Sequence, residues 1–160
     1  MTNDGASVQL REVVDSDLPH FYDQAQDLMS QRMACTPVRD RAAFDAHWTK
    51  IRADATSVIR TILVDGAVAG NVLSFERDGH REVGYWIGRP FWGRGVATGA
   101  VRAFLARDEP RRPLYGHVAK HNGASMRVLE KCGFTYAGED KEFSRIGDQV
   151  VEGVIYELAR

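Results

Sequence analysis

The stretch that decides the fold runs from Tyr85 to Arg107 and reads YWIGRPFWGRGVATGAVRAFLAR. Its first residues continue an alternating run of β-branched and aromatic side chains, which is typical of a strand. Pro90 ends that strand, and a glycine-containing turn follows. From Val96 onward the apolar residues recur at helical spacing. The stretch therefore predicts a strand, a tight turn and then a helix.

A glycine-rich turn that leads into a helix favours the binding of an anion, usually a phosphate. The first N–H groups of a helix have no intrahelical partner and lie at the positive end of the helix dipole. Gly93 and Gly95 would let a ligand approach closely because glycine has no Cβ, and Arg94 and Thr98 could add a charge and a hydroxyl. An ordinary strand-to-helix turn would fit the same pattern.

Two nucleotide-binding motifs are excluded at this turn. A P-loop needs a Lys-Ser/Thr pair after the glycines, and none is present. A dinucleotide fingerprint needs a third glycine, and Thr98 stands at that position.

The segment Trp92–Ala97 resembles the acetyl-CoA pyrophosphate loop of the GNAT N-acetyltransferases, which is usually written Gln/Arg-x-x-Gly-x-Gly/Ala. Gly95 and Ala97 match the last two fixed positions of that loop, whereas Trp92 replaces the Gln/Arg. A tryptophan at this position is familiar in the branch of the family that resembles the ribosomal-protein N-terminal acetyltransferases. The preceding segment Glu82–Gly88 (EVGYWIG) also resembles that branch.

A second segment carries the resemblance further. Asn122–Phe134 (NGASMRVLEKCGF) is similar to the family's Asn-x-x-Ser…Leu-Glu-Lys-x-Gly-Phe motif. The two motifs occur in the family's order, and the resemblance covers the chain from Val8 to Leu158.

The order of predicted elements is β-α-α-β-β-β-α-β-α-β-β, which fits an α/β (α+β) fold with one mixed, mostly antiparallel sheet and helices on both faces. We expect a single domain over residues 1–160 and about seven strands. The resemblance implies that the fourth and fifth strands are splayed and that the cofactor fills the gap. The predicted strands are Val8–Val13, Ser57–Val64, Ala67–Phe75, Arg81–Gly88, Leu114–Val118, a strand from Phe134 and Gln149–Leu158, and the predicted helices are Leu18–Met29, Asp40–Ala53, Val96–Arg107 and Asn122–Lys131.

Composition excludes several classes of protein. The 160 residues are 44% hydrophobic and 27% charged, as in ordinary globular domains. A net charge of −1 argues against a nucleic-acid binder, and no apolar run could cross a bilayer. The first five residues lack the plan of a signal peptide. Cys35 and Cys132 form no Cys-x-x-Cys motif and the histidines are scattered, so we expect no metal and a cytoplasmic location.

The resemblance implies which residues hold acetyl-CoA. The backbone of Tyr85 and Ile87 would pair with the pantetheine arm, and a backbone N–H in the gap would polarise the thioester carbonyl. Asn122 would contact the cofactor, although it could also simply cap its helix. The loop residues expected to bind the cofactor are Trp92, Gly93, Arg94, Gly95, Val96, Ala97 and Thr98, with Ser125 on the later helix.

Two catalytic residues are predicted. Glu82 lies on the strand that leads to the loop, where the family often has a glutamate, and it could remove a proton from the amine directly or through a water. The alternative is a carboxylate that is exposed or paired with an arginine, and His117 is the second candidate base. Ser125 is the candidate to protonate the leaving thiolate, because Leu129 stands where many relatives have a tyrosine.

The sequence thus predicts an acetyl-CoA-dependent N-acetyltransferase in which a primary amine attacks the thioester directly. A non-catalytic acyl-CoA-binding sensor is the main alternative, and an enzyme of another kind with a phosphate ligand is a third. The acceptor stays open among protein N-termini, polyamines, amino acids and amine antibiotics, because the predicted acceptor loops, Met29–Arg39 and Phe143–Gln149, vary freely. A homodimer is possible, and neither nucleic acid nor a membrane is expected as a partner.

Overall fold

The computed structural model describes residues 7–146 and 148–160. These residues form one seven-stranded sheet with the order β1-β2-β3-β4-β5-β7-β6. The prediction made for the first five residues lies outside the described part. The strands are β1 (Val8–Glu12), β2 (Val58–Val64), β3 (Ala67–Arg77), β4 (His80–Ile87), β5 (Leu114–Ala119), β6 (Thr135–Ile146) and β7 (Gln149–Leu158), and the helices are α1 (Leu18–Ala25), α2 (Leu28–Ala34), α3 (Arg41–Ala53), α4 (Val96–Arg107) and α5 (Gly123–Lys131).

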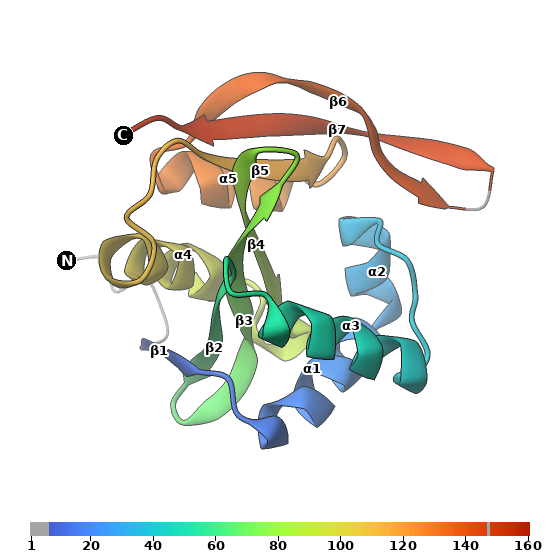
Figure 1. The fold of residues 1–160 in the computed structure, drawn as a ribbon, viewed down its shortest axis with the longest axis vertical. Coiled ribbons are helices and arrows are strands. Elements are labelled where there is room, and N and C mark those ends of the chain that lie inside the picture. The colour runs from blue at the N-terminus through green and yellow to red at the C-terminus, as the bar shows by residue number, and fades with distance from the viewer. Residues whose placement is uncertain (1–6, 147) are drawn as a thin grey trace.

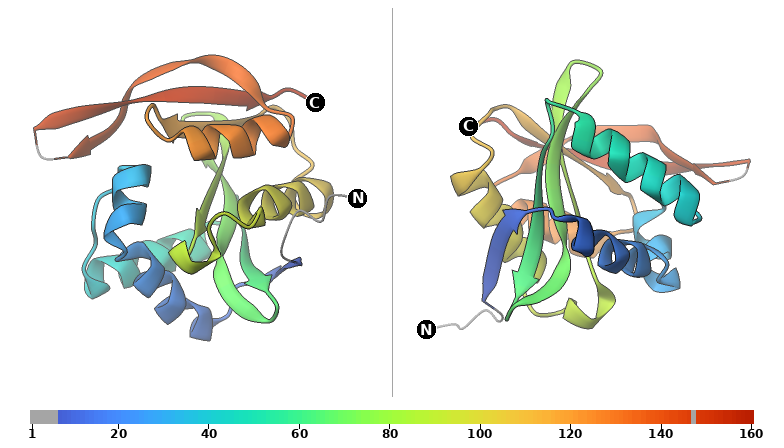
Figure 2. Two further views of the ribbon diagram at one scale, coloured as in Figure 1. Left: turned by 180° about the vertical axis from the view of Figure 1, so that it is seen from behind. Right: turned by 60° about the horizontal axis from the view of Figure 1, so that its bottom comes forward.

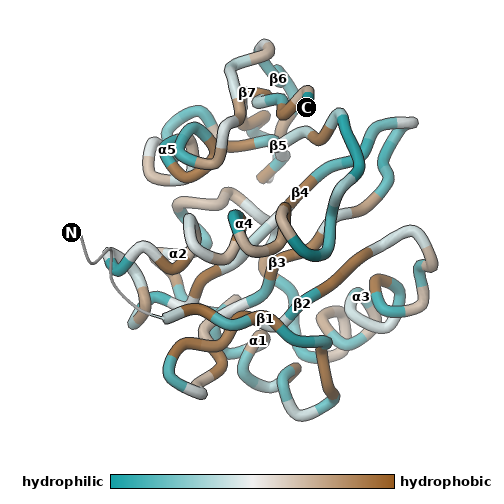
Figure 3. Tube along the Cα trace, turned by 90° about the vertical axis from the view of Figure 1, so that its left-hand side faces the viewer, coloured by the Kyte–Doolittle hydropathy of each residue, from teal (hydrophilic) through white to brown (hydrophobic). Residues whose placement is uncertain are grey.

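Helices cover both faces of the sheet, as predicted. Helices α4 and α5 lie on one face, and α1, α2 and α3 gather on the other (Figures 1 and 2). The β6–β7 hairpin crosses the top of the molecule in Figure 1 and extends above α2. In the tube of Figure 3, hydrophobic segments lie along the central strands. The predicted α/β fold is therefore confirmed.

Each face of the sheet has its own apolar core. The larger core joins α4 and α5 to the strands, and Phe104, Leu114 and Leu129 are almost fully buried in it. The smaller core joins α1 and α3, through Phe21, Phe44 and Trp48. Because side chains along a strand alternate between the two faces of the sheet, a single strand can contribute side chains to both cores.

Strands β4 and β5 are the one parallel pair among the described strands, and they are joined at a single residue pair, Glu82 with Tyr115. Every other neighbouring pair is antiparallel and runs over five or more residues, as β3 and β4 do from Gly70 and Ile87 to Arg77 and His80. The predicted splay between the fourth and fifth strands is confirmed.

The prediction for the first helix is wrong about where the helix ends. We expected Leu28 and Met29 to continue the buried face of the helix that begins at Leu18, but both side chains are exposed. The helix stops at Ala25, and the Asp27 carboxylate then accepts hydrogen bonds from the N–H and hydroxyl of Ser30 and starts α2. Helix-capping chemistry at Asp27 therefore overrides the apolar spacing.

Both predicted acceptor loops contain regular structure. The first, Met29–Arg39, is helical as far as Ala34. The second, Phe143–Gln149, belongs to β6 up to Ile146, and Gly147 lies outside the described residues. The bulge expected near Gly70 is present as a register shift, because Ile62 pairs with Gly70 and the next residue pairs with Val68.

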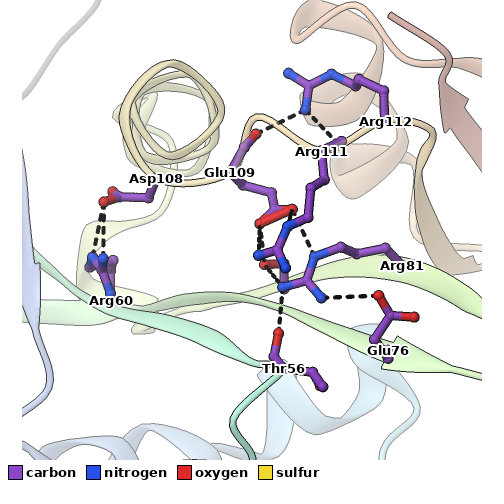
Figure 4. Close-up of polar contacts among 9 residues, drawn as sticks. Thr56, Arg60, Glu76, Arg81, Asp108, Glu109, Arg111 and Arg112 are labelled. Atoms are coloured by element: carbon purple, nitrogen blue, oxygen red, sulfur yellow. Dashed lines mark hydrogen bonds and ion pairs between the residues drawn. The ribbon is translucent and has the colours of Figure 1, made fainter.

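A buried ion-pair cluster ties the closed end of the splay together (Figure 4). The Glu109 carboxylate is fully buried and accepts hydrogen bonds from the Arg81 and Arg111 guanidiniums and the Ser74 hydroxyl. Arg81 also donates to the Thr56 carbonyl at 2.6 Å. The cluster joins β3, β4 and the end of α4. Burial raises the pKa of Glu109, but the hydrogen bonds from Arg111, Arg81 and Ser74 outweigh it and leave the pKa below its ordinary value.

We expect Glu109→Gln to lower the free energy of unfolding by about 3 kcal/mol, because it removes the fully buried counter-charge of Arg81 and leaves only the 3.3 Å contact with the more exposed Glu76. Since the folded pKa of Glu109 is lowered from 4.5, its contribution is present above that pH and is lost as the pH falls through the folded pKa. The difference between variant and wild type should therefore shrink in acid. Urea unfolding at several pH values measures it.

The matched control is Asp45→Asn, which breaks an exposed ion pair with Arg41 and should cost less than about 1 kcal/mol. Equal stability losses in the two variants would show that the Glu109 cluster does not hold the fold.

Candidate active site

A cavity of about 510 Å3 lies where β4, α4 and α5 meet, at the open side of the splay. It is the predicted cofactor site, and it collects residues from both motifs. The predicted residues that line it are Tyr85, Ile87, Trp92, Gly93, Gly95, Val96, Ala97, Thr98, Asn122 and Ser125.

The N-terminus of α4 faces this cavity without a side-chain cap. Gly95, its N-cap residue, has φ 72°, and Gly93 has φ 73°. Both angles lie in the left-handed region, which glycine adopts without a steric penalty and most other residues avoid. A Cβ at Gly93 would meet no atom within 4 Å, so the space in front of the loop is open. The uncapped N–H groups of the first turn are therefore free to bind an anion.

Arg94 is the one predicted loop residue that does not line the cavity. Its guanidinium lies over the Phe91 ring and 3.9 Å from the Asp65 carboxylate. Two cations that the sequence reasoning missed, Arg127 and Lys131 on α5, line the cavity instead. Their spacing of four residues places them on one face of the helix and could have indicated a shared role.

A hydroxyl pair lies on the α5 side of the gap. The Tyr85 and Ser125 hydroxyl oxygens are 2.6 Å apart, and the phenol also donates to the Ser125 carbonyl at 3.1 Å. Burial raises the pKa of Tyr85, so the phenol keeps its proton at neutral pH. The Asn122 side chain accepts from the Ser125 N–H, so it caps α5 as well as lining the cavity. The phenol of Tyr85 was missed, because the sequence assigned only its backbone a role.

The exposed Trp92 side chain joins the loop to β4. Its indole N–H donates to the Ile87 carbonyl at 2.9 Å. The Ile87 carbonyl therefore already has a hydrogen-bond donor. Of the two residues predicted to pair with the pantetheine arm, Tyr85 keeps its backbone groups available for that pairing.

A smaller cavity of about 160 Å3 lies between β4 and β5 themselves. Tyr85, Trp86 and Ser125 line both this cavity and the cofactor cavity. His117 and Phe143 line it from the opposite side of the gap. An acetyl group at the end of the pantetheine arm would lie here.

Glu82 and His117 lie together beside this smaller cavity. The Glu82 carboxylate is buried and accepts two hydrogen bonds from the Arg77 guanidinium, at 2.6 and 2.7 Å. His117 Nε2 is 3.9 Å from Glu82 Oε2, and His117 Nδ1 is 2.8 Å from Asp140 Oδ2. Only His117 of these lines the cavity. Its contact with Asp140 was missed, because Asp140 lies on β6, two strands away.

The described residues include neither a metal-binding cluster nor a membrane-spanning helix. Within 7–146 and 148–160, no group of three or more His, Cys, Asp or Glu side chains could hold a metal ion. The helices in the same part of the chain include none that is long and apolar enough to span a membrane.

Comparison with known proteins decides the family. Residues 7–135 match the model of the acetyltransferase (GNAT) domain. The chain belongs to the GNAT family. It is also 27% identical over 121 residues to YdaF of Bacillus subtilis, which is named as a candidate ribosomal N-acetyltransferase. That match covers 71% of this chain and 65% of YdaF, so the chain spans slightly less than two thirds of this relative. The predicted GNAT family is confirmed.

Solved structures agree with the fold. The spermidine N-acetyltransferase of Vibrio cholerae in complex with CoA and spermine has a TM-score of 0.82 at 17% identity, with 95% of each chain covered. The microcin C7 self-immunity acetyltransferase in complex with acetyl-CoA and AMP has a TM-score of 0.79 at 17% identity, with coverages of 99% and 94%.

We predict that Gly95→Glu weakens acetyl-CoA binding at least about tenfold, or about 1.4 kcal/mol. The new side chain puts a negative charge where the pyrophosphate would lie. Isothermal titration calorimetry measures the affinity, and thermal unfolding checks that the variant is folded.

Gly95→Asn is the matched control, because asparagine tolerates the left-handed backbone and carries no charge. A folded Gly95→Glu variant that binds acetyl-CoA as tightly as wild type would show that the cofactor lies elsewhere.

Proposed function

We propose that this protein transfers the acetyl group of acetyl-CoA to a primary amine, which attacks the thioester directly. The observation that carries the proposal is the gap between β4 and β5. An uncapped helix N-terminus lies at its outer end, and a small cavity with a hydroxyl pair on one side and a histidine on the other lies inside it.

Tyr85 and Ser125 serve the leaving group in this proposal. Both line the cofactor cavity, so the Ser125 hydroxyl can reach the sulfur at the end of the pantetheine arm. When the tetrahedral intermediate collapses and the C–S bond breaks, Ser125 donates its proton to the thiolate. The neutral Tyr85 phenol, 2.6 Å away, hydrogen-bonds to the Ser125 oxygen as its proton leaves, and the pair regains one proton from water once the thiol departs. This pair takes the place of the family tyrosine that Leu129 replaces.

His117 and Glu82 serve the amine. The attacking amine must lose a proton, and a positioned base supplies a rate factor of about 10²–10⁴. Arg77 occupies both oxygens of Glu82, whereas His117 faces the cavity. His117 therefore takes the proton on Nε2, while Asp140 accepts the hydrogen bond from Nδ1. Glu82, 3.9 Å from Nε2, stabilises the imidazolium that forms.

The relatives contain or are named for different molecules. Spermine is bound to the Vibrio cholerae enzyme, AMP to the microcin C7 immunity enzyme, and ribosomal protein is implied by the name of YdaF. An amine is the acceptor in our proposal, and the relatives alone do not choose among these classes. A homodimer and a cytoplasmic location stay predictions.

Thiol release from acetyl-CoA should depend on an added amine. In a panel of aromatic amines, amino acids, polyamines and peptides, at least one class should raise release above the spontaneous rate and yield a product heavier by one acetyl group in mass spectrometry. If acetyl-CoA binds and no amine raises release, the protein is the acyl-CoA sensor of the alternative interpretation.

We predict that Glu82→Gln lowers turnover at least about tenfold near neutral pH, with acetyl-CoA affinity unchanged. His117→Gln should lower it at least as much. Both deficits should shrink as the pH rises toward the amine's own pKa, about 10 for a lysine-like amine, because more acceptor then arrives deprotonated. Turnover is measured as a function of pH with saturating acetyl-CoA.

Glu139→Gln is the control, since Glu139 is a half-exposed carboxylate on the same strand as Asp140. The Glu82→Gln/His117→Gln double variant should be no slower than the slower single variant, because both residues act on one proton. Independent, multiplicative losses would refute the shared step, and a loss that is equal at every pH would indicate positioning rather than proton removal.

A further inference from the structure

A third cavity, of about 450 Å3, lies on the face of the sheet that α1 and α3 cover. The cofactor cavity is a different one, lined by α4, α5 and part of α2, and Trp86 lines both. Thr36 and Trp86 line both this third cavity and the small cavity between β4 and β5. A molecule in the third cavity can therefore present one end to the reaction site past Trp86, from the side opposite the cofactor.

Five aromatic side chains line one part of the third cavity. Phe21, Phe44 and Trp48 are buried there and pack on one another, with ring centroids 5.0 and 6.2 Å apart. Phe75 and Trp86 complete the lining from the strands. Such walls favour an apolar or aromatic ligand, because burying its surface releases water from both partners.

One amide side chain of the lining can bind a ligand. Asn71 is only 7% exposed, and its side-chain amide keeps accessible surface and makes no hydrogen bond to any of the described residues. It lies directly opposite Trp86 in the β3–β4 pairing, at the passage to the reaction site. This amide can therefore hydrogen-bond to a polar group near the amine end of a ligand.

The rim of the cavity carries positive charge. Arg39 and Lys50 line it, and within the described residues neither side chain has an ion-pair partner. Burial, together with the charges of Arg39 and Lys50, lowers the pKa of His47, which also lines the cavity.

Two carboxylates also line the cavity. Glu76 pairs with Arg81 at 3.3 Å, whereas the exposed Asp54 carboxylate accepts hydrogen bonds only from the neutral groups of Thr56 and Ser57 and keeps its charge. Within the described lining, Asp54 is therefore the one carboxylate without an ion-pair partner.

We propose that the acceptor is a primary amine with an aromatic body and an anionic group at its far end. The amine passes Trp86 toward His117, the body lies among the aromatic walls, and the anion lies at Arg39 and Lys50. Polyamines are disfavoured, since the unpaired cations Arg39 and Lys50 outnumber the one unpaired carboxylate, Asp54, in the described lining. This inference rests on the proposed acetyl transfer and names its substrate class.

The test uses three phenethylamines that differ only in the para substituent: a carboxylate, a carboxamide and a trimethylammonium group. We expect kcat/KM to fall in that order, with the carboxylate about fivefold above the carboxamide and spermidine below all three. Calorimetric titration of the carboxylate into the protein with CoA bound measures binding without turnover and should show the same preference.

Variants test whether the anionic group of the acceptor binds at Arg39 and Lys50. Arg39→Gln/Lys50→Gln should remove the preference for the carboxylate, so that the ratio of kcat/KM for the carboxylate to that for the carboxamide falls from about five to about one. The matched control is Arg107→Gln, which removes an exposed positive charge in the last turn of α4, away from all three cavities. Asn71→Leu should weaken all three phenethylamines alike.

The outcomes separate this inference from the proposed function. If amines are acetylated but the trimethylammonium compound or spermidine is preferred, the acceptor class is wrong and acetyl transfer stands. If the carboxylate preference survives in Arg39→Gln/Lys50→Gln, the anion does not lie at this rim and the inference is refuted. If no amine is acetylated and the carboxylate does not bind, both proposals fail.

Discussion

The parting of β4 from β5 is the constraint on which the rest of the site depends. The two strands are neighbours in one sheet, yet they pair only where Glu82 faces Tyr115. Beyond that point their facing N–H and C=O groups have no strand partner, and such groups need one. A pantetheine arm carries amides that can supply it. At the closed end, the buried pair of Arg81 with Glu109 fixes β4 against β3 and the end of α4, so the strands separate in one direction only.

In our proposal the two substrates approach the gap from different sides. Because successive side chains of β4 point to opposite faces, Tyr85 reaches Ser125 beneath α5, whereas Trp86 faces the α1–α3 side. The cofactor would enter along α4 and α5, and the acceptor would enter past Trp86. The hydroxyl pair and His117, which line the small cavity, would then act on the leaving thiolate and on the amine respectively.

The sequence predicted what depends on local spacing and composition. The strand, glycine turn and helix from Tyr85 to Arg107 form as expected, since each part follows from alternation, Pro90 and the glycines. Contacts between distant elements were not predictable in this way. The Tyr85–Ser125 and His117–Asp140 pairs join residues 40 and 23 positions apart, and they depend on the strand order β4-β5-β7-β6. The split between α1 and α2 was missed because the cap at Asp27 outweighs an unbroken apolar pattern.

The most direct measurement is a crystal structure with a bisubstrate conjugate in which the acetyl carbon links CoA to para-carboxy-phenethylamine. Our account predicts that the pyrophosphate lies on the N–H groups that follow Gly95, the sulfur lies beside Ser125, and the ring lies among the aromatic side chains around Trp86. A conjugate whose pantetheine arm lies outside the gap between β4 and β5 would contradict the account. A ring on the α4–α5 face of the sheet would contradict the separation of the two substrates.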